Sequence, residues 1–375
     1  MMSETPVRHL LHVFPTFNLG GSQSRFIKLA NSFGAAYHHH ILAMDGCYDA
    51  GRLLQSQVVW EPLQIKHAKG TALANQKAYR QVLRTLKPDL LLTYNWGAIE
   101  WAAANVPRRV AQVHVEDGFG PDEAQHQLRR RVWARRVLLG LMRVPVFAAS
   151  RHLAHIAVAQ WHLAAPRVGF IPNGVALPVW PQGAVPPRDP TRPLTIGTVA
   201  MLRKEKNIAR LFKAFAVLRS TQVARLVVVG DGPDRAALEA LAQALNIAAD
   251  VQFAGFQNNP QQFLLEFDVF ALSSDTEQLP IALLEAMACG LPVVATRVGD
   301  VALVVPAEAH DCLAAPDDAA FTNRLLHVVQ NPSQWPRWTQ AGRLQVEQHY
   351  GVDTMLQRWR AVFSGDVALA LQGGC

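Results

Sequence analysis

The chain has 375 residues, of which half are apolar and 17% are charged. This composition is typical of a globular protein, and it excludes collagen-like, coiled-coil and disordered chains. The length predicts two domains of about 150 residues each. The net charge of +7 is uneven, because residues 1–175 hold 20 Lys and Arg against 10 Asp and Glu, whereas residues 176–375 hold 16 against 19.

Short β-branched or Leu-rich runs alternate with longer helical patterns, and this alternation is typical of parallel sheets covered by helices. In the first half the predicted strands are 10–14, 40–43, 90–93, 110–114, 146–149 and 168–171, with helices at 22–33 and 71–86 between them. In the second half the predicted strands are 194–199, 225–229, 251–253, 269–272 and 292–295. Beyond residue 317 the pattern is helical to about residue 370, which predicts a helical extension rather than a third domain. The alternation of strands and helices predicts an α/β fold class.

A proline-rich stretch, residues 178–193, separates the two halves. It contains six prolines and almost no apolar periodicity, which predicts an interdomain linker. We therefore expect an N-terminal domain at 1–177 and a C-terminal domain from residue 194 to 345. Open parallel sheets bind ligands at the carboxyl ends of their strands, so a nucleotide or phosphate ligand is expected in a cleft there.

Neither a membrane span nor an export signal is expected. The longest apolar stretches, such as 137–142 and 291–295, are far shorter than the roughly 18–20 residues that cross a bilayer, and the N-terminus lacks the apolar core of a signal peptide. We therefore expect a cytoplasmic protein. Its positive charge allows nucleic acid, an anionic membrane or a phosphorylated ligand as partner, but no nucleic-acid-binding signature is present, so nucleic acid is not expected.

The cysteines and histidines do not predict a metal site. Cys47, Cys289, Cys312 and Cys375 show neither C-x-x-C pairing nor a His at zinc-finger spacing, so reduced, buried thiols are expected. The run His38 to His40 enters a predicted strand, where alternation sends neighbouring side chains to opposite faces and disfavours a three-His site. His152 and His155 share a helical face without a carboxylate nearby.

The strongest chemical signal is the segment from Asp275 to Gly290, DTEQLPIALLEAMACG. A strand ends before it, Pro280 stands where a helix can begin, and the helix ends at Gly290. The free backbone N–H groups near Leu279 to Ala282 would form an anion site for a pyrophosphate. Glu277 and Glu285 flank that site, and their carboxylates suit the hydroxyls of a ribose or a sugar. A solvated loop residue and a helix-dipole contact remain the alternatives for the two glutamates.

This segment resembles the E-x7-E signature of the retaining glycosyltransferases of family 4. Their GT-B fold consists of two Rossmann-like parallel-sheet domains that face a cleft, with a C-terminal crossing helix. Other motifs agree in the expected order: Gly20-Gly21, Ile171-Pro-Asn173-Gly174, Gly197 to Lys206, Gly230-Asp-Gly232-Pro233 and Leu291 to Gly299. The resemblance covers nearly the whole chain, and it implies that a helix within residues 346–375, around Val352 to Val362, packs back on the N-terminal domain.

The resemblance implies that the first domain binds the acceptor and the second binds the nucleotide-sugar donor. Glu285 would hold the donor ribose, Glu277 the sugar hydroxyls, and Lys206 would neutralise the leaving diphosphate, where charge builds up during transfer. The backbone of Gln278, Leu279, Pro280 and Ile281 would meet the diphosphate. The other donor-binding residues that the resemblance implies are Gly20, Gly21, Asn173, Arg203, Gly230 and Phe256.

One position departs from the family pattern. Five residues before Lys206 the family has an Arg that also grips the diphosphate, but this chain has Met201. Arg203, which would face the same side of an extended strand, or Lys204 is expected to take over that role. Without such a replacement, donor affinity or turnover should suffer, and a non-catalytic nucleotide-sugar binding protein is the alternative.

His114 and Asp117 are the candidate catalytic residues of the first domain. His114 ends the predicted strand 110–114, so we expect its side chain to point into the cleft, where similar enzymes place a His at the donor sugar. A buried structural His is the alternative. Glu116 or Asp117 would orient the acceptor hydroxyl or act as a base, and Asp117 ranks after His114.

The sequence thus predicts a retaining glycosyltransferase that moves a sugar from a UDP- or GDP-sugar to a hydroxyl of a glycan or lipid-linked saccharide in polysaccharide synthesis. By the resemblance, transfer is a front-face displacement in which the leaving diphosphate helps to deprotonate the acceptor, so neither a metal nor a glycosidase-type carboxylate pair is required. A UDP-sugar 2-epimerase of the same fold is the alternative. Such an enzyme needs acid/base carboxylates and no acceptor.

A run of arginines in the first half suggests a peripheral contact with the inner face of an anionic membrane. These arginines are Arg129, Arg130, Arg131, Arg135, Arg136 and Arg143, and Trp133 and several leucines lie among them. At 100° per residue they scatter around the helix, so a plain solvated helix fits the run equally well.

Overall fold

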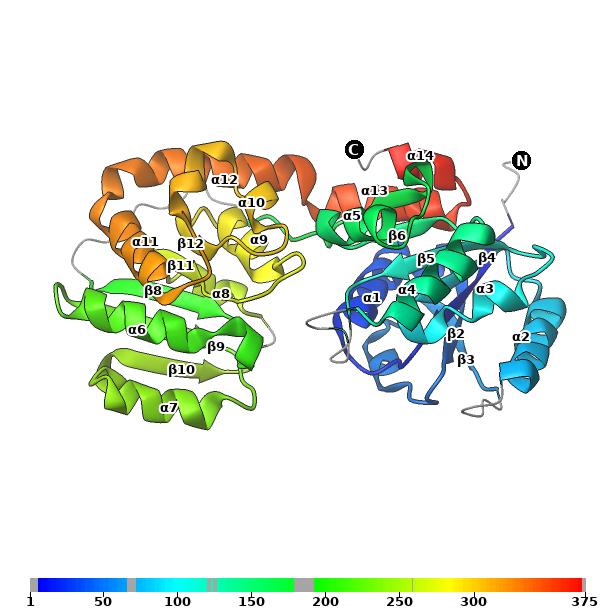
Figure 1. Cartoon of the computed structure of the whole chain (residues 1–375), viewed down its shortest axis with the longest axis horizontal. Helices are drawn as coiled ribbons and strands as arrows, with labels where there is room; N and C mark the ends of the chain where they lie inside the picture. The colour runs from blue at the N-terminus through cyan, green and yellow to red at the C-terminus, as the bar shows by residue number, and fades with distance from the viewer. Residues whose placement is uncertain are drawn as a thin grey trace. The chain divides into compact units, whose positions relative to one another are not determined.

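The computed structural model describes residues 6–65, 72–119, 123, 127–178, 192–257 and 259–372. It divides into two compact units: unit 1 comprises Met1–Asn173 and Met355–Cys375, and unit 2 comprises Gly174–Thr354. Each unit contains one parallel sheet with helices packed on it (Figure 1). The predicted fold class, α/β with two Rossmann-like sheets, is therefore confirmed.

The strands of unit 1 are β1 (Arg8–Phe14), β2 (Tyr37–Ala43), β3 (Val59–Leu63), β4 (Leu90–Tyr94), β5 (Ala111–Glu116), β6 (Val146–Ala148) and β7 (Val168–Phe170). Its helices are α1 (Gly21–Phe33), α2 (Ala72–Leu86), α3 (Trp101–Ala104), α4 (Arg129–Arg135), α5 (Arg151–Ala159), α14 (Val367–Gln372) and most of α13 (Val352–Phe363). A π-helical turn, Arg136–Leu141, continues α4. The sheet order is β3-β2-β1-β4-β5-β6-β7.

The strands of unit 2 are β8 (Leu194–Val199), β9 (Ala224–Val229), β10 (Val251–Gly255), β11 (Val269–Leu272), β12 (Val293–Thr296) and β13 (Leu313–Ala314). Its helices are α6 (Ile208–Arg219), α7 (Arg235–Ala244), α8 (Gln261–Leu264), α9 (Ile281–Ala288), α10 (Val301–Val304), α11 (Asp318–Gln330) and α12 (Trp335–His349). The sheet order is β10-β9-β8-β11-β12-β13. The order reverses between β8 and β11, as in dinucleotide-binding folds.

Both faces of the unit 1 sheet carry an apolar cluster, because parallel strands covered on two sides present hydrophobic side chains on both. On one face Leu10 and Phe14 pack with Phe26 of α1 and with Trp359 and Phe363 of α13. On the other face, side chains of α2 and α3 pack on the sheet in a separate cluster. Residues 355–372 therefore belong to the body of unit 1.

Three features differ from the sequence-based expectations. The edge strand β3 was not predicted, because it is largely exposed and contains Pro62. The strand β13 was not predicted either, because it has only two residues. Residues 346–354 belong to unit 2, since α12 continues to His349 and packs against α9. Residues 179–191 of the predicted linker lie outside the described part of the chain.

The cysteines of the described residues are free. Cys289 and Cys312 are buried, and burial raises the pKa of each thiol to about 12, whereas Cys47 is half-buried. Cys375 lies outside the described residues. Within the described ranges, no helix is long and apolar enough to cross a membrane.

Gly230 directly follows β9 and packs against Ala200 in the loop that follows β8. Its φ of +131° lies in a region that side-chain-bearing residues rarely adopt, and a Cβ added there would lie 1.9 Å from the carbonyl oxygen of Ala200. The position therefore requires glycine for two independent reasons.

We predict that Gly230→Ala destabilises the protein by about 2–4 kcal/mol, because it adds both backbone strain and a backbone clash. Urea unfolding followed by tryptophan fluorescence measures the change. The matched control is Gly342→Ala in α12, where a Cβ would make an ordinary 3.5 Å contact with Met287. That substitution should leave stability unchanged or raise it by up to about 1 kcal/mol. Equal midpoints for the two variants would contradict the argument.

Candidate active site

The carboxyl edge of the unit 2 sheet, where β8 and β11 lie side by side, gathers most of the predicted donor-binding residues. The loop after β8 carries Arg203 and Lys206, and the loop after β11 carries Glu277. At such a reversal of strand order the flanking helices lie on opposite faces, which leaves room for a ligand between the two loops. The fold therefore brings together two segments about 70 residues apart in sequence.

Lys206 and Glu277 form an ion pair at this edge. Lys206 Nζ donates to Glu277 Oε1 at 2.7 Å, and Ser274 Oγ donates to the same oxygen at 2.7 Å. The Glu277 side chain is only 8% exposed, and that of Lys206 is 25% exposed. The alternative that Glu277 is a solvated loop residue is therefore wrong.

A second set of contacts ties the two loops together. The backbone N–H of Asp275 donates to the carbonyl of Glu205 at 2.8 Å, and Asn207 Nδ2 donates to the Asp275 carboxylate. The buried Arg210 forms an ion pair with Asp275 at 2.8 Å and donates to the carbonyl of Ser273. These contacts of Asn207 and Arg210 were not predicted, although Asn207 directly before an apolar helix is a recognisable cap.

The helix α9 begins beside the ion pair. Pro280 is its N-cap residue, and the N–H groups of Leu283 and Leu284 already bond to the Pro280 carbonyl. The N–H groups of Ile281 and Ala282 belong to the first turn, which has no helical acceptors and favours anions. Glu285, on α9 one turn beyond Ile281, is half-buried.

The neighbouring candidates lie around these loops. Met201 is 49% exposed and Arg203, two residues further on, is exposed as well. Gly230 packs against the loop after β8, and Phe256 directly follows β10 with 69% of its surface exposed. In unit 1, Gly20 is the N-cap of α1 and Gly21 its first residue.

The carboxyl edge of the unit 1 sheet is organised by Arg25, which the sequence analysis did not consider. This buried arginine of α1 grips both carboxylate oxygens of Asp117, with Nη2 at 2.9 Å from Oδ2. It also lies 3.4 Å from Asn173 Oδ1, and Asn95 Oδ1 accepts from the Asp117 backbone at 2.8 Å. Two predicted site residues, Asp117 and Asn173, therefore meet through an unpredicted cation.

His114 is not placed as expected. The strand β5 extends to Glu116, two residues beyond the predicted end, so His114 lies inside the strand and is fully buried. Its Nδ1 shares a hydrogen bond of 2.9 Å with Thr93 Oγ1, and its Nε2 lies 3.5 Å from Glu116 Oε2. The prediction that His114 ends its strand is wrong, and its surroundings are those of the alternative, a buried structural His.

The arginine run is divided between interior and surface. Arg135 is fully buried and donates to both oxygens of Glu123 at 3.2 Å, where Arg131 adds a third contact. Burial alone would raise the pKa of the Glu123 carboxyl, but the hydrogen bonds from Arg135 and Arg131 hold it below its usual value. The other four arginines, Arg129, Arg130, Arg136 and Arg143, are exposed.

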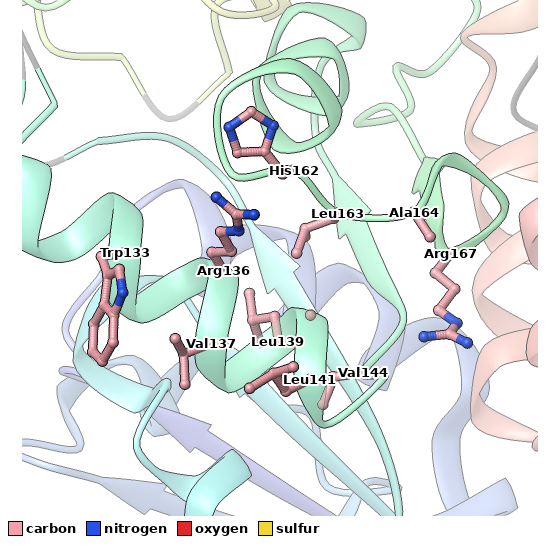
Figure 2. Close-up of a pocket in the computed structure, with 11 residues that line it drawn as sticks. Trp133, Arg136, Val137, Leu139, Leu141, Val144, His162, Leu163, Ala164 and Arg167 are labelled. Carbon is pink, nitrogen blue, oxygen red and sulfur yellow. The ribbon is translucent and has the colours of Figure 1, made fainter.

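A cavity of about 320 Å³ opens beside this segment (Figure 2). Trp133, Arg136 and Leu141 line it from α4 and the π-helical turn, and His162 and Arg167 line it from the segment before β7. Because Arg167 directly precedes β7, the cavity lies near the amino-terminal ends of the strands, away from Asp117. Trp133 is 67% exposed and Leu141 74%.

Comparison with known proteins identifies the family. Residues 186–345 match the model described as glycosyl transferases group 1. A Bacillus subtilis protein named as a glycosyltransferase, EpsF, is 30% identical over 314 residues, which cover 76% of this chain and 78% of EpsF. The chain belongs to the group 1 glycosyltransferases. This membership favours glycosyl transfer over the epimerase alternative.

Two further similarities concern a segment of this glycosyltransferase and its overall fold. A Campylobacter jejuni enzyme named as an N-acetylgalactosaminyltransferase acting on a diphospho-undecaprenol-linked saccharide is 36% identical over 99 residues, 26% of this chain and 27% of that enzyme. The crystal structure of Anabaena HepE in complex with UDP superposes with a TM-score of 0.79 at 19% identity, covering 96% of this chain and all of HepE. This second likeness shows the GT-B fold.

We predict that Arg25→Met destabilises this glycosyltransferase by about 3–5 kcal/mol, because it leaves the Asp117 carboxylate without its partner. The urea midpoint of unfolding measures the effect, and Arg52→Met, at an exposed arginine of the same unit, serves as the control. The double variant Arg25→Met/Asp117→Leu should be more stable than Arg25→Met alone. A wild-type midpoint for Arg25→Met would refute a structural role for the pair.

Proposed function

We propose that this glycosyltransferase is a retaining enzyme of family 4. It moves a sugar from a UDP- or GDP-sugar to a hydroxyl of a glycan or lipid-linked saccharide in the synthesis of a cell-surface polysaccharide. The observation that carries the proposal is the Lys206–Glu277 ion pair beside the first turn of α9. A cation, a carboxylate and an anion-binding helix terminus are the groups that a nucleotide-diphosphate sugar requires.

In this proposal the diphosphate lies against the first turn of α9, where the N–H groups of Ile281 and Ala282 point at it. Lys206 neutralises the charge that develops on the leaving diphosphate, and Glu285 accepts hydrogen bonds from the ribose diol. Because Lys206, the helix terminus and Arg203 supply the positive charge, we propose that transfer is independent of a metal ion. Glu277 binds hydroxyls of the donor sugar.

Retention follows in this proposal from displacement on one face of the sugar. The leaving diphosphate takes up the proton of the acceptor hydroxyl, so no carboxylate nucleophile of the glycosidase kind is needed. Asp117 orients the acceptor, and Arg25 keeps its carboxylate fixed. The UDP in the HepE structure supports a nucleoside diphosphate as leaving group.

A lipid-linked acceptor at the inner face of the cytoplasmic membrane fits the surface of unit 1. Trp133 and Leu141 are exposed beside Arg129, Arg136 and Arg143, and an aromatic side chain among cations suits an anionic bilayer surface. The excess of basic residues in 1–175 acts in the same direction. The undecaprenol-linked substrate named for the Campylobacter enzyme supports this class of acceptor.

The test of the donor site is calorimetric titration with UDP and GDP and then with their common sugar conjugates. The wild-type protein should bind one nucleotide selectively, and Glu285→Ala should weaken that binding about ten- to hundredfold, because hydrogen bonds to charged groups contribute about 1.5–3 kcal/mol. Glu308→Ala, at an exposed glutamate of the same unit, is the control. If neither nucleotide binds, or Glu285→Ala binds as tightly as the wild type, the donor site is misplaced.

A second prediction concerns the departure at Met201. Met201→Arg should raise affinity for the nucleotide diphosphate about tenfold, because an exposed position in the loop after β8 would gain a cation. Met201→Gln, of similar size and uncharged, should leave affinity unchanged. Product formation assayed with donor and acceptor distinguishes the remaining alternative: turnover by the wild type excludes a non-catalytic binder, whereas turnover only by Met201→Arg supports one.

A further inference from the structure

Three histidines meet on one face of the unit 1 sheet. His9 lies on β1, and His38 and His40 lie on β2. In the register of the two strands His9 pairs with His38, and His40 is two residues further along, so all three side chains point to the same side. In the sequence only the consecutive run 38–40 stands out, and alternation correctly removes His39 from the group. The neighbouring strand supplies the third member, His9.

The ring nitrogens of these residues are close enough to share one ion. One nitrogen from each of His9, His38 and His40 lies within 4.8 Å of the others, and His9 Nδ1 is 3.0 Å from His40 Nε2. A tetrahedral zinc ion, with bonds of about 2.0–2.1 Å to nitrogen, holds its ligands about 3.3 Å apart. The rings of His38 and His40 are stacked at 4.4 Å, so side-chain rotation is required to direct the three nitrogens at one ion.

Glu61 of β3 fixes the orientation of one ligand. Its Oε1 lies 2.6 Å from His40 Nδ1, in register opposite His40 on the neighbouring strand. A carboxylate that accepts the Nδ1 proton leaves the Nε2 lone pair directed away from it, and here Nε2 faces His9. Metal-ligating histidines are commonly held by such a carboxylate on their other nitrogen.

Burial is graded across the group: His40 is buried, His38 half-buried and His9 exposed. An ion can thus enter from the side of His9 while His40 remains fixed by Glu61. The histidines His12 and His39, by contrast, are fully buried on the other face, where they bond to each other and to Tyr94. Among the residues that the structure describes, this group of three is therefore the accessible one, because it is open to solvent through His9.

We propose that His9, His38 and His40 bind a divalent transition-metal ion of the Zn²⁺ class, with Glu61 orienting His40. Three neutral nitrogen donors suit zinc and its first-row neighbours, whereas Mg²⁺ and Ca²⁺ prefer oxygen ligands. The group lies near the amino-terminal ends of β1 and β2, roughly 16 Å along β1 from the carboxyl edge that holds Asp117. The ion links β1 to β2, and its role is to stabilise unit 1.

The experiment is calorimetric titration of the full chain, prepared without a polyhistidine tag, with ZnCl₂. The wild type should bind one Zn²⁺ per chain saturably, and Co²⁺ in its place should give the intense visible absorption of a tetrahedral site. His9→Ala and His38→Ala should each weaken Zn²⁺ binding at least about tenfold, and Glu61→Gln about ten- to hundredfold. The control, His155→Ala, changes an exposed histidine of α5 and should bind as the wild type does.

Thermal unfolding provides a second readout. Zn²⁺ should raise the midpoint of the wild type and of His155→Ala, and it should not raise that of His9→Ala, because a ligand stabilises only the state that binds it. His9 is exposed, so this variant decides the question even if His38→Ala fails to fold. Absence of saturable Zn²⁺ binding, wild-type affinity in His9→Ala, or equal binding of Mg²⁺ would overturn the proposal.

Discussion

A parallel sheet places the carboxyl ends of all its strands at one edge, and both units of this glycosyltransferase depend on that constraint. Most side chains within the strands are apolar, and the charged side chains of the two candidate sites follow the strand ends. In unit 2 this rule brings the loop after β8 to the loop after β11, and Lys206 meets Glu277. In unit 1 the same rule brings Asp117 and Asn173 to Arg25.

The charged groups at these edges are held before any ligand arrives. Glu277 is fixed by Lys206 and Ser274, and the backbone around it is anchored through Asp275 to Arg210. Buried ion pairs contribute little net stability, because the desolvation of both partners offsets their attraction. Under the proposed function their value is positional, since they hold the charged groups close to the place where charge develops during transfer.

The sequence was informative where a signal is local. Strands such as β8 and β11 are short apolar runs between turns, and Pro280 and Gly290 bracket α9, so these elements and the E-x7-E segment could be located. Contacts between distant segments could not be read: Arg25 and Asp117 are 92 positions apart, and nothing local marks them as partners. His114 shows how much a small error in a predicted strand end matters. The strand is two residues longer than predicted, so the His114 side chain lies in the interior and not at the carboxyl edge.

The Lys206–Glu277 pair also determines how a donor is discriminated under the proposed function. A diphosphate that recruits Lys206 takes a partner away from a carboxylate that is 8% exposed. Glu277 would then keep its hydrogen bond from Ser274 and need a second hydrogen-bond donor, because a buried carboxylate with too few hydrogen bonds is destabilising. A hydroxyl of the attached sugar supplies that hydrogen bond, whereas a free nucleotide does not. The ion pair therefore couples recognition of the diphosphate to recognition of the sugar, and it favours the complete nucleotide sugar over the nucleotide released after transfer.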